Sequence, residues 1–194
     1  ELHLHRSMGL VKDVFTQEAM KELPGRSGIA HVRYSTYGES KLANAQPLLF
    51  KYREGDLAVA TNGNIVNAGE IRRDLERKGS IFQTSSDTEV VAHLIARSRH
   101  DDIVEAVKEA LNQLVGGFAF LFITPKKMIA ALDPHGLRPL VMGRLGDAVL
   151  FASETCAFDA VGAEWIRDVT PGEIIIVDEA GVRSERYAEM RRRA

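Results

Sequence analysis

The most informative stretch of the sequence is the run Phe118-Ala119-Phe120-Leu121-Phe122-Ile123, which is apolar at every position. A second run, Ile174-Ile175-Ile176-Val177, has the same character. β-Branched and aromatic residues favour strands, and a strand that is apolar on both sides needs a covering layer on each. We therefore expect a sheet packed on a second sheet, with helices outside.

Apolar periodicity on either side of these runs predicts strands, then helices, then strands. Helical segments are predicted from Val11 to the break at Pro24-Gly25, from near Asn67 to Gly79, from Ser86 onward, and over 101–114. Strands are predicted around Leu2 and Leu4 and at 29–34, 48–52, 57–60, 118–124, 128–132, 140–144, 148–152 and 173–177. This meander-like order indicates an α+β domain whose sheets are largely antiparallel.

The composition is that of one soluble domain. The 194 residues include 25 basic and 27 acidic side chains, a balance without the electrostatic footprint of a nucleic-acid binder. A length near 200 favours one domain, to which we assign residues 1–194. No apolar run approaches the roughly 18 residues that cross a bilayer. A single cysteine excludes an internal disulfide and a thiolate metal cluster within the chain, and indicates a reducing compartment.

The ends of the sequence suggest truncation. The chain opens on Glu1 rather than Met and closes on Arg191-Arg192-Arg193-Ala194. We therefore expect a fragment that is cut at both ends.

Three short stretches could carry chemistry, and each also has a purely structural interpretation. Arg33 offers a planar fork that suits a carboxylate, or it simply reaches solvent. Asn62-Gly63 forms either a tight hairpin turn or an oxyanion hole built from the Asn62 amide and a nearby backbone N–H. Asp87 either caps a helix or binds an ammonium group.

Two further stretches are predicted to be structural. Asp133-Pro134-His135-Gly136-Leu137-Arg138-Pro139-Leu140 is expected to be a turn between two strands. Cys156, in Ser153-Glu154-Thr155-Cys156-Ala157-Phe158, is expected to be buried and without a catalytic part. The six histidines show no metal-ligand spacing.

In combination, the stretches resemble the glutaminase domain of the amidophosphoribosyltransferase family, which is a class II glutamine amidotransferase. The resemblance covers nearly the whole chain. It rests on the order and spacing of His31-Val32-Arg33-Tyr34, Gln46-Pro47-Leu48, Asn62-Gly63-Asn64, Gln83-Thr84-Ser85-Ser86-Asp87-Thr88-Glu89, 133–140, 153–159 and Pro171-Gly172-Glu173.

The resemblance implies a fold of the N-terminal-nucleophile hydrolase type, with two stacked antiparallel sheets between helical layers. It implies that Arg33, assisted by Thr36, binds the α-carboxylate of glutamine and that Asp87 binds the α-ammonium group. Asn62 and the Gly63 N–H would form the oxyanion hole. A mature N-terminal cysteine, with its own α-amino group as base, would attack the side-chain amide to give a thioester and ammonia.

The resemblance also implies partners. Ammonia would pass to a phosphoribosyltransferase domain, which these 194 residues do not contain. We expect no cofactor in this chain, whereas Mg²⁺ and, in some members, an iron–sulfur cluster would belong to that other domain. A cytoplasmic homo-oligomer without nucleic-acid or membrane partners is expected.

Two departures from the family pattern leave alternatives open. The N-terminal Cys-Gly of the family is missing, so we expect the isolated chain to show no measurable glutaminase turnover, and Thr61 stands where many relatives carry His. A non-catalytic relative that binds glutamine or acts as a scaffold is one alternative. Another class II amidotransferase, such as a glucosamine-phosphate synthase, is the other, and 133–140 and 153–159 disfavour it.

Overall fold

The computed structural model describes residues 1–33 and 41–191. The helices are α1 (Val11–Val14), α2 (Gln17–Lys21), the 3-10 helix η1 (Leu42–Asn44), α3 (Ala68–Arg77), α4 (Glu89–Arg97), α5 (Ile103–Leu111) and α6 (Cys156–Val161). The strands are β1 (Leu48–Tyr52), β2 (Gly55–Ile65), β3 (Gly116–Ile123), β4 (Met128–Leu132), β5 (Val141–Leu145), β6 (Ala148–Ala152), β7 (Glu164–Asp168), β8 (Glu173–Asp178) and β9 (Gly181–Arg186).

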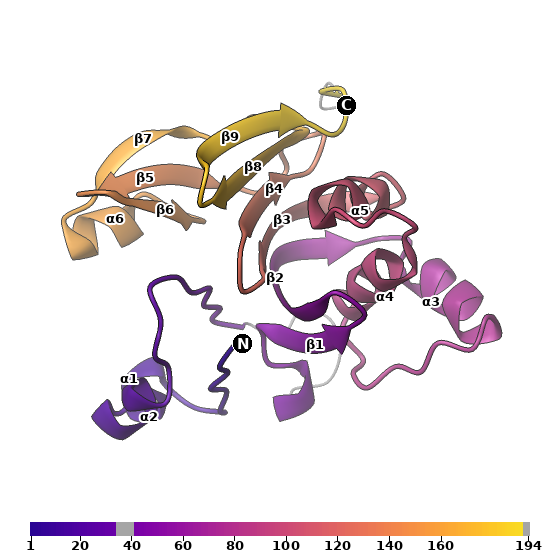
Figure 1. Ribbon diagram of the computed structural model, residues 1–194, viewed down its shortest axis with the longest axis horizontal. Helices are drawn as coiled ribbons and strands as arrows, with labels where there is room; N and C mark the ends of the chain where they lie inside the picture. Colours follow the sequence, from indigo (N-terminus) through magenta and orange to yellow (C-terminus); the bar gives the residue numbers. More distant parts are fainter. Residues whose placement is uncertain (34–40, 192–194) are drawn as a thin grey trace.

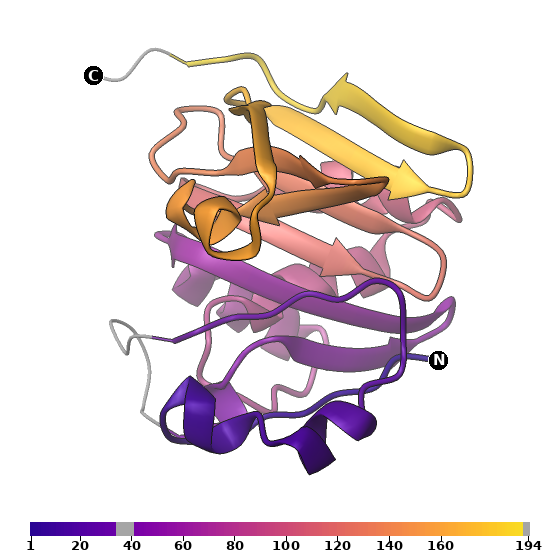
Figure 2. The ribbon, with the colours of Figure 1, turned by 90° about the vertical axis from the view of Figure 1, so that its left-hand side faces the viewer.

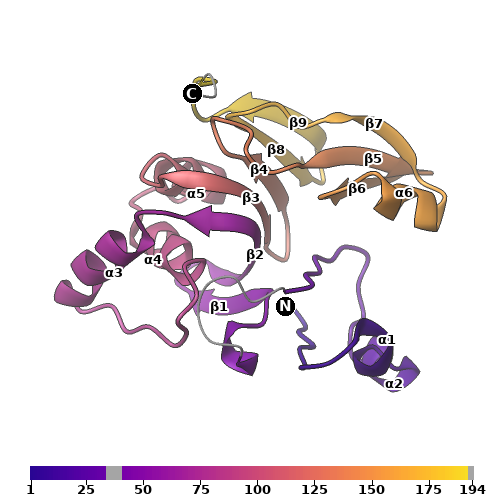
Figure 3. The same ribbon diagram turned by 180° about the vertical axis from the view of Figure 1, so that it is seen from behind.

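The described strands form two antiparallel sheets. One has six strands in the order β1-β2-β3-β4-β8-β9, and the other has three in the order β6-β5-β7. Helices α3, α4 and α5 cover one face of the six-stranded sheet, and the three-stranded sheet lies against its other face (Figures 1 and 3). The predicted α+β class and the stacking of two sheets are confirmed.

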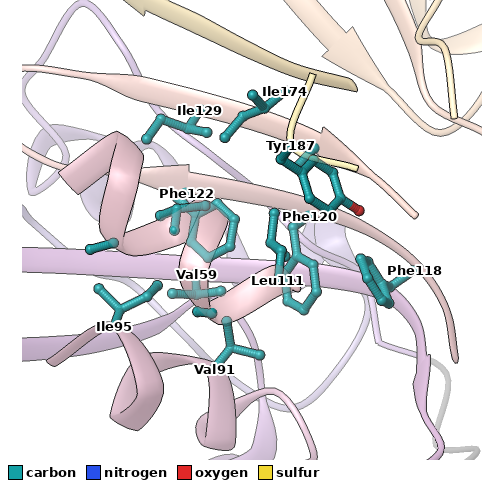
Figure 4. Packing of buried hydrophobic residues seen from close by; sticks show 14 of the residues in the cluster. Val59, Val91, Ile95, Leu111, Phe118, Phe120, Phe122, Ile129, Ile174 and Tyr187 are labelled. Atoms are coloured by element: carbon teal, nitrogen blue, oxygen red, sulfur yellow. The ribbon is translucent and has the colours of Figure 1, made fainter. Parts of the chain in front are cut away.

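The doubly apolar strand β3 explains this layering. Phe118, Phe120 and Phe122 point to the helical side, where they pack with residues of α4 and α5 (Figure 4). Ala119 points to the opposite side and joins a second apolar cluster with Met142 of the three-stranded sheet. Successive side chains of a strand face opposite ways, so one strand can serve both cores.

Helix α6 covers the outer face of the three-stranded sheet (Figure 2). Met142 faces the six-stranded sheet, so its neighbour Gly143 faces away from it. A Cβ atom at Gly143 would lie 2.8 Å from the Phe158 ring of α6, and a glycine is therefore needed for the helix to pack there. Helices lie outside both sheets, as predicted.

The strands predicted around Leu2 and at 29–34 are not observed. Residues 1–7 belong to no strand, and the Leu2 N–H donates to the Asp56 carboxylate over 3.0 Å. Within 29–33, the described part of the second segment, Val32 is 78% exposed and no strand forms. Apolar alternation becomes a strand only where a neighbouring strand accepts its backbone hydrogen bonds, and none does so here.

The ends of the helices also differ from prediction. The N-terminal helical segment divides into α1 and α2, with the Thr16 hydroxyl capping α2. The helix predicted from Ser86 begins at Glu89, because the Ser86 hydroxyl accepts the Thr88 N–H in a preceding turn. Asn67 occupies the N-cap position of α3, but its side chain bonds to the 113–115 segment instead.

Two strands, β7 and β9, were not predicted. Both lie at the edge of a sheet, and both contain too few apolar residues to predict a buried strand. Charged residues are common on edge strands, where they discourage pairing with other molecules.

Candidate active site

Asn62 and Gly63 lie inside strand β2, which excludes the hairpin-turn interpretation. They pair with Ala119 and Phe118 of β3 in an unbroken register. On the other side of β2, the last pair with β1 joins Val59 to Leu48. From Ala60 onward, that edge of β2 has no strand partner within the described residues.

The backbone of Gly63 points to this open edge. Phe118, which lies opposite Gly63, uses its own N–H and C=O on Asp133, at 3.2 Å to the carboxylate and 2.9 Å from the Asp133 N–H. In an antiparallel ladder, residues facing one another either exchange both hydrogen bonds or neither. Gly63 and Phe118 therefore exchange neither, and the N–H of Gly63 is directed away from β3.

The neighbouring N–H groups on this edge are held by side chains. Gln46 Oε1 accepts the Thr61 N–H over 2.6 Å, and the Asp87 carboxylate accepts the Ile65 N–H over 2.9 Å. His31 Nε2 donates to the Thr61 carbonyl over 2.9 Å. The Gly63 N–H thus lies between Gln46 and Asp87, on an edge that is fixed from both sides.

The surroundings of His31 favour its neutral form. Burial lowers its pKa, the nearby charge of Arg33 lowers it further, and the bond to the Thr61 carbonyl acts in the opposite direction. Because a carbonyl can only accept, this bond places the ring proton on Nε2.

The Asn62 side chain lies on the opposite face of β2 from Thr61. It shares a face with its partner Ala119, which belongs to the apolar cluster between the two sheets. There, Asn62 Nδ2 donates to Ser153 Oγ over 3.2 Å. The carboxamide is therefore directed into the space where the edge of one sheet meets the other.

Gly63 is required by its close approach to β3. Its φ of +144° lies in the region that side chains rarely adopt, and an added Cβ would overlap the Gly117 carbonyl oxygen. The same Cβ would lie 2.7 Å from the Phe118 Cα atom. A glycine at this position allows the N–H to be presented without displacing β3.

Asp87 is buried, and its surroundings shift the pKa of its carboxyl group. Burial raises the pKa of its carboxyl, whereas backbone hydrogen bonds and the nearby charge of Arg33 lower it. The structure thus brings Arg33 and Asp87 close enough for their charges to interact, although 54 positions separate them (87 − 33). Thr36, the third predicted binding residue, lies outside the described residues.

The turn that carries Asp87 is braced by buried polar side chains. Glu89 accepts the N–H groups of Gln83 and Thr84. Burial raises the pKa of its carboxyl, but the interaction with His93 and the bonds from Gln83 and Thr84 together lower it to about 2. Asn44 exchanges two hydrogen bonds with Ser85. Gln46 also donates to the Thr88 hydroxyl over 3.2 Å, so one side chain ties this turn to β2.

A pocket of about 210 Å³ opens beside this edge. His31, Arg33 and Gln46 line it together with N-terminal residues, including Arg6 and Phe15. Arg6 donates to the Ala45 carbonyl over 2.8 Å, and its partial burial lowers its pKa. The pocket therefore includes Arg33, whereas Asp87 and the residues of β2 do not line it.

Sequence reasoning assigned no part in the site to Gln46, His31 or Ser153. Gln46 and His31 lie in two of the motifs of the resemblance, and nothing in their spacing indicates that both reach Thr61. Ser153 lies three residues before Cys156, and nothing in the sequence indicates its contact with Asn62.

The structure corrects the prediction for Cys156, which is exposed rather than buried. In α6 only Phe158 is buried, because the short helix turns a single position towards the sheet. The Cys156 thiol instead lies 3.6 Å from the Glu154 carboxylate.

The 133–140 turn has a clear structural basis. The Asp133 carboxylate is fully buried and accepts the N–H groups of Phe118, His135 and Leu137. It thereby fixes the turn between β4 and β5 to the start of β3.

Over residues 1–33 and 41–191, no cluster of three or more His, Cys, Asp or Glu side chains is arranged to hold a metal ion. In the same part of the chain, no helix has the length and apolar character needed to cross a membrane.

A family model described as a glutamine amidotransferase domain matches residues 31–160. The chain belongs to this glutamine amidotransferase domain family. Its relatives narrow the class further. Amidophosphoribosyltransferase of Bacillus subtilis (strain 168) is 50% identical over 189 residues, which are 97% of this chain and 40% of that protein. Amidophosphoribosyltransferase 2, chloroplastic, of Arabidopsis thaliana is 50% identical over 179 residues, 92% of this chain and 32% of that protein.

The fold agrees with these relatives. A solved structure of glutamine phosphoribosylpyrophosphate (PRPP) amidotransferase from B. subtilis, complexed with ADP and GMP, matches with a TM-score of 0.90 and 50% identity. The match covers 95% of this chain and 40% of that one. The resemblance to the glutaminase part of amidophosphoribosyltransferases and the N-terminal-nucleophile hydrolase type of fold are thereby confirmed. The chain spans about 40% of the length of the B. subtilis relative.

Proposed function

We propose that residues 1–194 belong to a glutaminase domain and supply its glutamine-binding residues and its oxyanion hole, for the release of ammonia from the side-chain amide of glutamine. The observation that carries the proposal is the direction of the Gly63 N–H, which faces the open edge of β2 between Gln46 and Asp87. With the neighbouring Asn62 amide, it would stabilise the oxygen that becomes negative when the amide carbonyl is attacked. Donors held by a sheet need no reorganisation during the reaction.

The charged pair supports recognition of an amino acid. A glutamine zwitterion carries a carboxylate, which suits the Arg33 guanidinium, and an ammonium group, which suits Asp87. Thr36 would assist at the carboxylate. The burial that raises the Asp87 pKa disfavours its charged form in the free protein, and a bound ammonium group would restore that form.

The names of the relatives support a wider role. In this proposal the ammonia is transferred to phosphoribosyl pyrophosphate, on a phosphoribosyltransferase domain, to form phosphoribosylamine in purine biosynthesis. The nucleophile would be an N-terminal cysteine, and Cys156 would take no part. Mg²⁺ or an iron–sulfur cluster in that other domain, a homo-oligomeric state and a cytoplasmic location stay predictions.

Calorimetric titration of the 194-residue chain with L-glutamine tests the binding half. We expect Arg33→Ala and Asp87→Asn each to weaken glutamine binding about tenfold or more, since each leaves one charge of the ligand unpaired. Arg99→Ala, at an exposed arginine outside the site, is the matched control and should bind as the original chain does. N-acetyl-glutamine, which lacks the ammonium group, should bind weakly and be insensitive to Asp87→Asn. Equal affinity in all variants would contradict the proposal.

The transfer half is tested in the whole protein. Phosphoribosylamine formation should proceed with either glutamine or ammonium as nitrogen source. Arg33→Ala should remove the glutamine-dependent reaction and leave the ammonium-dependent one. Loss of both reactions together, or of neither, would contradict the assignment.

A further inference from the structure

Ser153 is the residue of the second sheet that reaches the candidate oxyanion hole. It follows directly after β6, whose carboxyl end points towards the six-stranded sheet (Figure 1). Its hydroxyl accepts the Asn62 amide hydrogen over 3.2 Å, across 91 positions of sequence. The contact therefore joins the two sheets at the side chain that the proposed chemistry depends on.

The contact with Ser153 restrains a side chain that is otherwise free to turn, that of Asn62. Thr61 is held through its backbone by Gln46 and His31, but these bonds leave the Asn62 side chain free to turn. The terminal torsion of an asparagine is broad and nearly two-fold, so the nitrogen and oxygen of the amide can exchange places. Only the nitrogen can donate to an oxyanion.

We propose that Ser153 is a positioning residue, which restrains the Asn62 side chain through the hydrogen bond between Asn62 Nδ2 and Ser153 Oγ. One of the two amide hydrogens is donated to Ser153 Oγ, and the other remains for the oxygen of a ligand. The functional consequence rests on the proposed glutaminase function, whereas the orientation of the amide does not. The second amide hydrogen of Asn62 suits a ligand with a carbonyl oxygen, which in this proposal is the side-chain amide of glutamine.

Ser153 can be substituted without disturbing the packing around it. Ser153 is exposed, so Ser153→Ala removes the hydroxyl without opening a cavity. Ser153→Thr keeps the hydroxyl and should restore the contact. Thr155→Ala, in the same turn, is the matched control, because the Thr155 hydroxyl is exposed and does not cap α6.

The first measurement is the ¹⁵N relaxation of the Asn62 side-chain NH₂ group in the 194-residue chain, assigned with Asn62→Ala. We expect a well-ordered amide in the original chain, Ser153→Thr and Thr155→Ala, and a clearly more mobile one in Ser153→Ala. Equal mobility in all four would overturn the proposal. Because this readout needs no ligand, it decides about Ser153 even if the chain does not bind glutamine.

The second measurement compares L-glutamine with L-norvaline, which has the same zwitterion but no carboxamide. Ser153→Ala should weaken glutamine binding about three- to tenfold, the range of one neutral hydrogen bond, and leave norvaline binding unchanged. Ser153→Thr should restore the preference for glutamine. An equal loss for both ligands would overturn the positioning role. Failure of the original chain to bind either ligand would contradict the proposed function and leave the relaxation result to judge Ser153.

Discussion

Replacing Gly63 with alanine would place a methyl group between β2 and β3. The added Cβ would overlap the Gly117 carbonyl oxygen and lie 2.7 Å from the Phe118 Cα atom, and both are backbone atoms that cannot swing aside. Overpacking of this kind costs about 1–3 kcal/mol, and holding alanine at a φ of +144° costs about 1–3 kcal/mol more. We therefore expect Gly63→Ala to lower the free energy of unfolding by about 2–6 kcal/mol.

Gly55→Ala provides a matched control in the same strand. Gly55 has a φ of +111° but open space around the added Cβ, so this substitution carries the conformational cost without the clash. Urea unfolding, followed by circular dichroism, gives both free energies of unfolding. Gly63→Ala should be more destabilising than Gly55→Ala by about 1–3 kcal/mol. Equal destabilisation would refute the close approach of β2 and β3 at Gly63.

Three further predictions concern other parts of the chain. Asp133→Ala should destabilise the fold by about 3–5 kcal/mol in thermal or urea unfolding, because three backbone N–H groups lose a charged acceptor; a change below about 1 kcal/mol would contradict its role. Cys156 should react rapidly with a bulky thiol reagent in the native chain, and Cys156→Ser should bind glutamine as the original chain does; slow modification would contradict the exposed position. Glutamine affinity should fall as the pH is lowered through the pKa of Asp87, which burial raises above the ordinary value of 3.8, since only the carboxylate pairs with an ammonium group. Asp87→Asn should remove this pH dependence. An unchanged pH profile in Asp87→Asn would exclude Asp87 as the titrating group.

Much of the fold could be predicted because its core is encoded in local patterns. The three phenylalanines of β3 and the smaller residues between them predict two different cores, and the structure contains both. The N-terminal segments were mispredicted for the opposite reason. Their apolar alternation is local, but a strand forms only where another strand supplies hydrogen bonds.

The candidate site was only partly predictable. Arg33, Asn62, Gly63 and Asp87 were identified because they stand in short motifs whose chemistry can be recognised. The side chains that hold this part of β2 are separated from it in the sequence by more residues than any motif spans. Gln46 and His31 reach Thr61 across 15 and 30 positions, and Ser153 reaches Asn62 across 91. Such contacts depend on the register of β2 against its neighbours and on the stacking of the sheets.

The most direct test of the central claim is a crystal structure of the 194-residue chain with L-glutamine. We predict that the side-chain carbonyl oxygen of glutamine accepts hydrogen bonds from the Gly63 N–H and from Asn62 Nδ2, with the α-carboxylate on Arg33 and the α-ammonium group on Asp87. Glutamine bound elsewhere, or bound with its side-chain oxygen turned away from the open edge of β2, would contradict the account.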